Sequence, residues 1–113
     1  MNDARDDADL TAWVRVCTRD ELLPGEFRTV WDGDTAIAVY DIEGALYAIE
    51  DHCTHDDGEL AGGELHGYEI ECPRHGARFD VRTGAALCAP AYVPVVTFPV
   101  RVVDGVIYTR DDR

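Results

Sequence analysis

Short apolar runs separated by turn residues dominate this sequence. Apolar and β-branched side chains are concentrated at residues 11–17, 27–31, 35–42, 45–50, 95–103 and 106–110, and each run predicts a β-strand. Glu43-Gly44 and Asp104-Gly105 separate consecutive runs and predict two hairpins, because Gly adopts positive φ without steric cost. No segment keeps a 3.6-residue apolar period, so at most one helical turn is expected, at residues 59–65. Strands spaced about 8–12 residues apart predict an all-β fold, an antiparallel sandwich or partial barrel.

The length of the chain predicts one domain. It has 113 residues, which suits a single domain over residues 1–113. Residues 1–10 contain four Asp and one Arg, so we expect a flexible acidic tail there. Residues 51–94 hold all four His and three of the four Cys, together with six of the ten Gly. We therefore expect a loop-built subdomain at about 51–94 that carries the chemistry.

The charge of the chain excludes several kinds of partner. It has 23 Asp and Glu against 10 Lys and Arg, a net charge of −13, which argues against binding to nucleic acid or to an anionic membrane. No apolar run approaches the roughly 20 residues that span a bilayer. The N-terminal residues lack the apolar region of a secretory signal and are not Arg-rich, so we expect a cytoplasmic protein. Its four Cys are then better interpreted as metal ligands or buried thiols than as disulfides.

Two short motifs carry ligand-type side chains. They are Cys53-Thr54-His55 and Cys72-Pro73-Arg74-His75, separated by 16 residues. Two thiolates and two imidazoles suit zinc or an iron–sulfur centre of mixed ligation. In a Cys₂His₂ finger, the two Cys usually lie close together in the sequence and the two His lie on a helix. Here each motif supplies one Cys and one His, an arrangement that would let both loops reach both irons of a 2Fe–2S cluster.

The motifs resemble those of Rieske proteins. The matching segments are Cys53-Thr54-His55 and residues 72–80 (CPRHGARFD), and residues 88–94 (CAPAYVP) resemble the proline-bearing loop that covers the cluster in that family. The β pattern on both sides agrees, so the resemblance extends over nearly the whole chain. It implies a Rieske fold and a Rieske-type 2Fe–2S cluster. By the same resemblance, Cys53 and Cys72 bind one iron, and His55 and His75 bind the other.

The resemblance also bears on the reduction potential. High-potential respiratory members have a disulfide between the two loops, and the matching positions here are Gly58 and Arg74. Those members also place Ser and Tyr hydroxyls near the cluster, where this chain has Ala77 and Phe79. Fewer hydrogen bonds and a net charge of −13 leave the reduced cluster less stabilised. We expect a potential at the low end of the Rieske range, which is roughly −150 to +300 mV.

The sequence is similar to the soluble Rieske ferredoxins of bacterial aromatic-ring dioxygenase systems. This similarity implies a monomeric one-electron carrier between an NAD(P)H-dependent flavoprotein reductase and a terminal Rieske oxygenase. No nucleophile–base pair and no GxGxxG or P-loop motif is present, so we expect neither an enzyme nor a nucleotide cofactor. Three alternatives stay open: a carrier for another acceptor, such as iron–sulfur assembly proteins; a nitrite-reductase small subunit; and a structural zinc module that binds a partner. The second is less favoured, because those subunits often lack the cluster ligands.

The other candidate residues are expected to be structural. The pattern predicts buried thiols and core indoles at Cys17, Cys88, Trp13 and Trp31. It predicts exposed loop positions at His52 and His66. The acidic residues 56–59 directly follow a candidate ligand, so they are expected at the rim of the metal end, where they are equally suited to a solvated surface and to partner docking.

Overall fold

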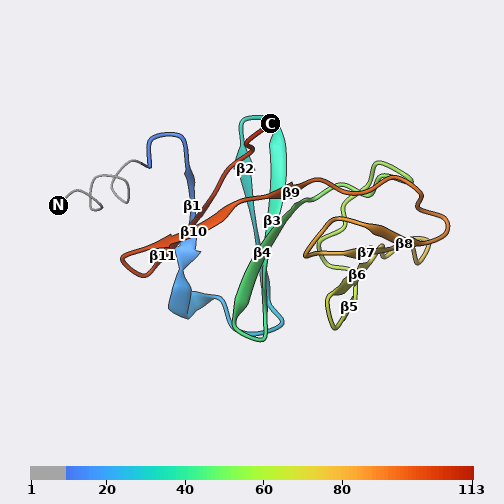
Figure 1. Ribbon diagram of the computed structural model, residues 1–113, viewed down its shortest axis with the longest axis horizontal. Helices are drawn as coiled ribbons and strands as arrows, with labels where there is room; N and C mark the ends of the chain where they lie inside the picture. The colour runs from blue at the N-terminus through green and yellow to red at the C-terminus, as the bar shows by residue number, and fades with distance from the viewer. Residues whose placement is uncertain (1–9) are drawn as a thin grey trace.

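The computed structural model describes residues 10–113, and nearly all of its regular structure is β-strand (Figure 1). The acidic tail predicted at residues 1–10 therefore lies, apart from Leu10, outside the described residues. One antiparallel sheet contains β1 (Val14–Thr18), β11 (Val106–Thr109) and β10 (Val100–Val103). A second contains β2 (Phe27–Asp32), β3 (Thr35–Ile42), β4 (Ala45–Glu50) and β9 (Thr97–Phe98). A third contains β5 (Leu65–His66), β6 (Glu69–Glu71), β7 (Arg78–Asp80) and β8 (Ala86–Cys88). A short 3₁₀ helix, η1 (Arg19–Glu21), follows β1, and the predicted all-β antiparallel fold is confirmed.

Both predicted hairpins are present. β3 pairs with β4, and β10 pairs with β11, each in an antiparallel register. The connecting residues all have positive φ, at 54° and 91° for Glu43 and Gly44 and at 51° and 77° for Asp104 and Gly105. Two consecutive residues of positive φ are typical of the type I′ turn, whose twist matches that of the flanking strands.

The central strand β3 connects two hydrophobic cores. Alternate side chains of a strand point to opposite faces of its sheet. Ala38, Tyr40 and Ile42 accordingly belong to the core that reaches β6 and β7. Ile37 and Val39 belong to the core that also contains residues of β1 and β11. The burial of β3 on both faces explains why its sequence is almost continuously apolar.

The predicted strand at residues 95–103 is instead divided between two sheets. Thr97 and Phe98 form β9 beside β4, whereas Val100 begins β10 beside β11. Pro99 separates the two strands and has no N–H with which to continue a ladder. Its carbonyl oxygen accepts a hydrogen bond from the Thr109 hydroxyl at 2.8 Å.

The third sheet lies at one end of the molecule, at the right of Figure 1. It falls within residues 51–94, the range predicted for the chemistry-bearing subdomain. Residues 59–65 form turns and the start of β5, so the helical turn expected there is absent and that prediction was wrong. The β6–β7 hairpin carries the second ligand motif in its connection, residues 72–77. Within residues 10–113, no helix is both long and apolar enough to cross a membrane.

Candidate metal centre

The first ligand motif lies in a loop that folds back on itself, residues 51–60, called here the first loop. The Cys53 N–H donates to the Gly58 carbonyl at 2.7 Å, and the Asp57 N–H donates to the Cys53 carbonyl at 2.8 Å. Asp51 closes the base of the loop, because its buried carboxylate accepts hydrogen bonds from the N–H groups of Leu60 and Ala61 at 2.8 and 2.7 Å. These contacts fix the position of Cys53 at the inner end of the loop.

The second motif lies in a similar loop, residues 72–77, called here the second loop. The Cys72 N–H donates to the Ala77 carbonyl at 2.7 Å, and the Gly76 N–H donates to the Cys72 carbonyl at 3.1 Å. Gly76 has a φ of 77°, which permits the chain to turn back toward β7. Both loops thus hold a Cys through backbone hydrogen bonds at their base and present a His nearer to their tip.

The structure brings the four predicted ligands together. Cys53 and Cys72 are buried, and their Sγ atoms lie within 4.8 Å of each other. One carboxylate oxygen of Asp56 lies within 4.8 Å of both sulfurs. The exposed imidazole rings of His55 and His75 have centroids 5.3 Å apart and are nearly perpendicular. Burial raises the pKa of the Cys53 thiol, because removal from water disfavours the charged thiolate.

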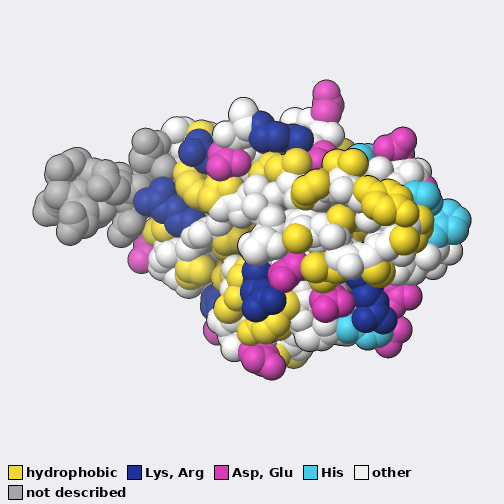
Figure 2. All heavy atoms as spheres, turned by 45° about the vertical axis from the view of Figure 1, so that its right-hand side comes forward, with side chains coloured by type: hydrophobic (Ala, Val, Ile, Leu, Met, Phe, Trp, Pro, Cys, Tyr) yellow, Lys and Arg dark blue, Asp and Glu magenta, His cyan; other side chains and the backbone are white. Residues whose placement is uncertain are grey.

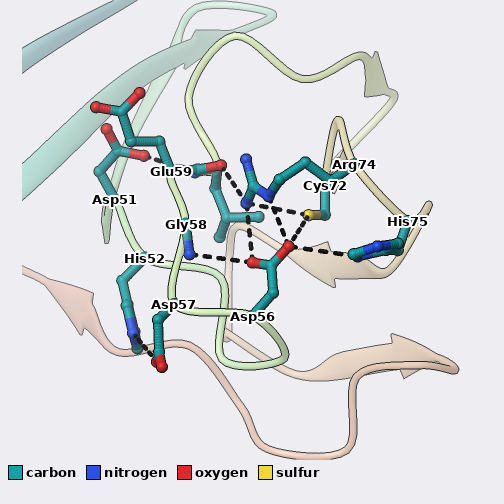
Figure 3. Close-up of polar contacts among 10 residues, drawn as sticks. Asp51, His52, Asp56, Asp57, Gly58, Glu59, Cys72, Arg74 and His75 are labelled. Carbon is teal, nitrogen blue, oxygen red and sulfur yellow. Dashed lines mark hydrogen bonds and ion pairs between the residues drawn. The ribbon is translucent and has the colours of Figure 1, made fainter.

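Asp56 and Arg74 form an ion pair beside these ligands, which sequence reasoning did not anticipate. In Figure 3, the Asp56 carboxylate lies between the Arg74 guanidinium and the His75 ring. Arg74 Nε is 2.6 Å from Asp56 Oδ2, and His75 Nδ1 is 3.3 Å from the same oxygen. The Arg74 guanidinium holds the pKa of Asp56 well below its usual range. The only sequence signal for this pair was an acidic residue after one ligand and an Arg before the other.

The loop resembling the cover segment, residues 88–94, lies against both ligand loops. The Thr54 hydroxyl donates to the Val93 carbonyl at 2.6 Å, and Cys88 Sγ lies 3.7 Å from the Gly76 carbonyl. Cys88 is exposed, so the expectation of a packed thiol was wrong there, whereas Cys17 is buried as expected. Two side-chain donors, the Thr54 hydroxyl and the Cys88 thiol, thus connect this segment to the ligand loops through backbone carbonyl oxygens.

Exposed apolar side chains lie on the same segment. Tyr92 is 82% exposed and Val93 is 59% exposed. Figure 2 shows histidine side chains at the right-hand end of the surface, with hydrophobic side chains beside them. This end of the molecule therefore combines accessible imidazoles with an apolar rim.

The donor set fits a mixed-ligand 2Fe–2S cluster. Two buried thiols lie on the protein side and two exposed imidazoles lie on the solvent side of one location. Thiolate and imidazole are the ligand types of a Rieske centre. A second group with metal-ligand atoms among the described residues contains Glu64, His66 and Glu71, but Arg78 already pairs with Glu71 at 3.4 Å.

The chain is similar to a known domain family and to several known proteins. The Rieske [2Fe-2S] domain family matches residues 12–99. The ferredoxin component of a naphthalene 1,2-dioxygenase system from Pseudomonas putida is 40% identical over 90 residues, covering 80% of this chain and 86% of the relative. The ferredoxin component of a p-cumate 2,3-dioxygenase system from the same species is 37% identical over 110 residues, covering 96% and 93%.

A solved structure shares the fold. The ferredoxin of carbazole 1,9a-dioxygenase from Nocardioides aromaticivorans IC177 superposes with a TM-score of 0.84 at 36% identity, covering 90% of this chain and 100% of that one. A complex of reduced oxygenase and oxidised ferredoxin in carbazole 1,9a-dioxygenase contains a chain with a TM-score of 0.83 at 40% identity, covering 88% and 93%. The predicted fold class, an all-β Rieske fold, is thereby confirmed.

Proposed function

Because the chain belongs to the Rieske [2Fe-2S] domain family, we propose that it is a one-electron carrier, the ferredoxin component of an aromatic-ring dioxygenase system. Its cofactor is a Rieske-type 2Fe–2S cluster. In this proposal, an NAD(P)H-dependent flavoprotein reductase supplies the electrons and a terminal Rieske oxygenase receives them, in the cytoplasm. The chain acts as a monomer and is not itself an enzyme. The observation that carries the proposal is the convergence of two buried thiols and two exposed imidazoles in a chain similar to several ferredoxin components.

We assign the ligands by residue. Cys53 and Cys72 would hold one iron, and His55 and His75 would hold the other, within the subdomain at residues 51–94. When bound, the cluster supplies one-electron redox chemistry. The backbone hydrogen bonds at the base of each loop fix the backbone of Cys53 and Cys72, the two residues that would supply sulfur ligands.

The exposure of the imidazoles determines where partners dock. His75 has 55% of its side chain exposed, and the apolar side chains of Tyr92 and Val93 lie on the segment beside the first loop. A redox partner that covers this end would bring its own centre close to the imidazole edges. The relative solved in complex with an oxygenase makes a terminal oxygenase the favoured acceptor.

A low reduction potential is part of the proposal. Ala77 and Phe79 are both fully buried and have no hydroxyl to donate to the cluster sulfurs. The net charge of −13 further opposes the addition of an electron. A low potential suits electron flow from NAD(P)H toward an oxygenase rather than quinol oxidation.

The first test is a visible spectrum followed by EPR after dithionite reduction. We expect a red-brown protein with a rhombic signal of low average g. A colourless protein that stays EPR-silent after iron–sulfur reconstitution and retains stoichiometric zinc would refute the electron-carrier proposal, in favour of a structural zinc module.

The ligand assignment has its own test. Replacing an imidazole by a thiolate adds a negative ligand, so His55→Cys or His75→Cys should lower the potential wherever a cluster still assembles. The matched control is His66→Cys, whose ring lies in β5 and contacts Glu71 at 2.7 Å instead of the centre. A potential unchanged in His75→Cys would show that His75 is not a ligand.

The acceptor is tested by single-turnover electron transfer. The dithionite-reduced chain is mixed with the oxidised terminal oxygenase of a carbazole 1,9a-dioxygenase system, and the loss of the reduced spectrum is followed. Reoxidation that depends on the oxygenase supports the proposal. Reoxidation by an iron–sulfur assembly protein but not by this oxygenase would favour the alternative acceptor.

A further inference from the structure

Arg74 joins the two ligand loops. Although it belongs to the second loop, its guanidinium makes a two-point contact with Asp56 of the first loop, at 2.6 Å from Nε and 3.0 Å from Nη2. The same Nη2 donates to the Glu59 carbonyl at 2.8 Å. Bidentate Arg–carboxylate contacts are directional as well as charged, so they fix the two loops in relation to each other.

The first loop leaves space for this guanidinium. A Cβ atom built on Gly58 would lie 2.4 Å from Arg74 Cζ and 2.5 Å from Arg74 Nη2. Any side chain at position 58 would therefore displace the guanidinium. The Gly58 N–H also donates to Asp56 Oδ1 at 3.0 Å, which orients the carboxylate toward Arg74. Backbone, carboxylate and guanidinium thus form one connected unit.

This unit contacts two of the assigned ligands. Arg74 Nη2 lies 3.3 Å from Cys72 Sγ, within reach of an N–H···S hydrogen bond, and Asp56 Oδ2 lies 4.0 Å from the same sulfur. Asp56 Oδ2 also lies 3.3 Å from His75 Nδ1. A carboxylate this close to the ligands would oppose addition of an electron if its charge were unpaired. The adjacent guanidinium offsets that charge and can stabilise the thiolate.

We propose that Arg74 is a positioning residue that holds the first and second loops together and raises the reduction potential of the centre by compensating the charge of Asp56. The proposal rests on the ligand assignment given above. Arg74 would then have two separable effects. It helps the protein to retain the cluster by linking the two loops, and its positive charge raises the reduction potential.

The test compares Arg74→Gln, Asp56→Asn and the double variant. Arg74→Gln removes the guanidinium and Asp56→Asn removes the charged, two-point acceptor, so both weaken the link, and cluster absorbance should be lost to a chelator about 10-fold or more faster than in the wild type. The potentials should move in opposite directions. Arg74→Gln leaves Asp56 unpaired and lowers the potential, whereas Asp56→Asn leaves the positive charge and raises it. The double variant should lie between the two.

Two further variants separate charge from geometry. Arg74→Lys keeps the charge but not the planar fork, so we expect a potential closer to the wild type than that of Arg74→Gln, with cluster loss still accelerated. Arg82→Gln is the matched control, because Arg82 pairs with Asp80 at 2.9 Å on β7 and makes no contact with the ligand loops in the structure's described part. It should leave both the potential and the rate of cluster loss unchanged.

The outcomes distinguish this proposal from the ligand assignment. A wild type without a Rieske EPR signal overturns the assignment. If the wild type has that signal, the reduction potentials of Arg74→Gln and Asp56→Asn decide the proposal. Potentials that shift in the same direction, or that do not shift in either variant, would show that Arg74 does not compensate the charge of Asp56. Complete failure of Arg74→Gln to hold a cluster supports the link between loops, and Asp56→Asn and Arg74→Lys then decide the effect on the potential.

Discussion

Gly63 offers a sensitive test of how the fold supports the metal centre. A Cβ atom at this position would lie 1.8 Å from the Glu71 carbonyl oxygen. An ordinary C···O contact is about 3.3 Å, so Gly63→Ala forces a separation of roughly 1.5 Å. Glu71 ends β6 and immediately precedes Cys72, so this displacement acts directly on an assigned ligand.

The cost can be worked from the contacts. Overpacking of this kind costs about 1–3 kcal/mol. The hydrogen bond from the Glu71 N–H to the Glu64 carbonyl, at 2.9 Å, is strained as well, which adds about 1 kcal/mol. We therefore expect Gly63→Ala to lower the free energy of unfolding by about 2–4 kcal/mol. For a chain of this size, that is a fall in Tm of roughly 10 °C or more.

The assay follows far-UV circular dichroism and visible absorbance during the same thermal scan. Gly67→Ala is the control, because Gly67 has a φ of 64° and nothing within 4 Å of the added Cβ. It should cost only about 1–2 kcal/mol of backbone strain and leave cluster content unchanged. If Gly63→Ala melts at the same temperature as Gly67→Ala and retains a full cluster, the close approach of Gly63 to Glu71 does not constrain the second loop.

Three other predictions concern charge. Arg19→Gln should lower the free energy of unfolding by roughly 3 kcal/mol, because Arg19 pairs at 2.8 Å with Asp41, whose side chain is only 2% exposed. Urea unfolding measures this difference, and a variant with the same urea midpoint as the wild type would refute the prediction. The Arg82 side chain lowers the pKa of Asp80, so this carboxylate stabilises the fold above its unfolded pKa and loses that effect as the pH falls through its folded pKa. The stability difference between wild type and Asp80→Asn should accordingly shrink as the pH falls below about 4. Reduction by a flavoprotein reductase should slow as salt is added if the net charge of −13 steers docking, and a rate unchanged across a wide range of ionic strength would exclude steering.

The central strands were predictable because their signals are local. β3 and β4 have the bounds that the apolar runs indicated, residues 35–42 and 45–50. A turn pair with positive φ separates them, and β3 is buried on both faces. Run length, composition and turn chemistry all agree there, so no tertiary information was needed.

The third sheet was not predictable in the same way. Its four strands are two or three residues long and have no apolar run of their own. They form because the chain returns and pairs Ile70 with Phe79, whose side chains are fully buried. His66, expected in an exposed turn, accordingly lies in β5 with its ring 2.7 Å from Glu71. Pairing of such short strands is decided by tertiary context rather than by propensity.

Residue type also failed to predict burial at individual positions. Trp31 was expected in the core but is 63% exposed, because β2 is an edge strand with one face toward solvent. Trp13 is only partly buried, and its ring contacts the guanidinium of Arg110 at 5.0 Å. The face on which a side chain lies depends on strand register, which composition does not fix.

The difference between local signals and tertiary contacts also explains which features of the metal centre the sequence predicts. The ligand types and their spacing are local features, so Cys53, His55, Cys72 and His75 could be chosen from the sequence. The contacts of Arg74 with the first loop could not, because residues 15 to 18 positions apart become neighbours only once both loops are folded.

Burial and exposure divide the centre into two parts with different physical roles. The Cys53 and Cys72 thiols belong to the same hydrophobic core as Tyr40 of β3 and Phe79 of β7. Changes in that core, such as Gly63→Ala, should therefore affect fold stability and cluster retention together. The Arg74 pair lies at the surface, with 37% of the Arg side chain exposed, where a change of charge leaves the core packing intact. We expect one variant to shift the reduction potential without lowering Tm and another to lower Tm without shifting the potential. Such a pair would show that separate groups of residues control the potential of the centre and the stability of the fold.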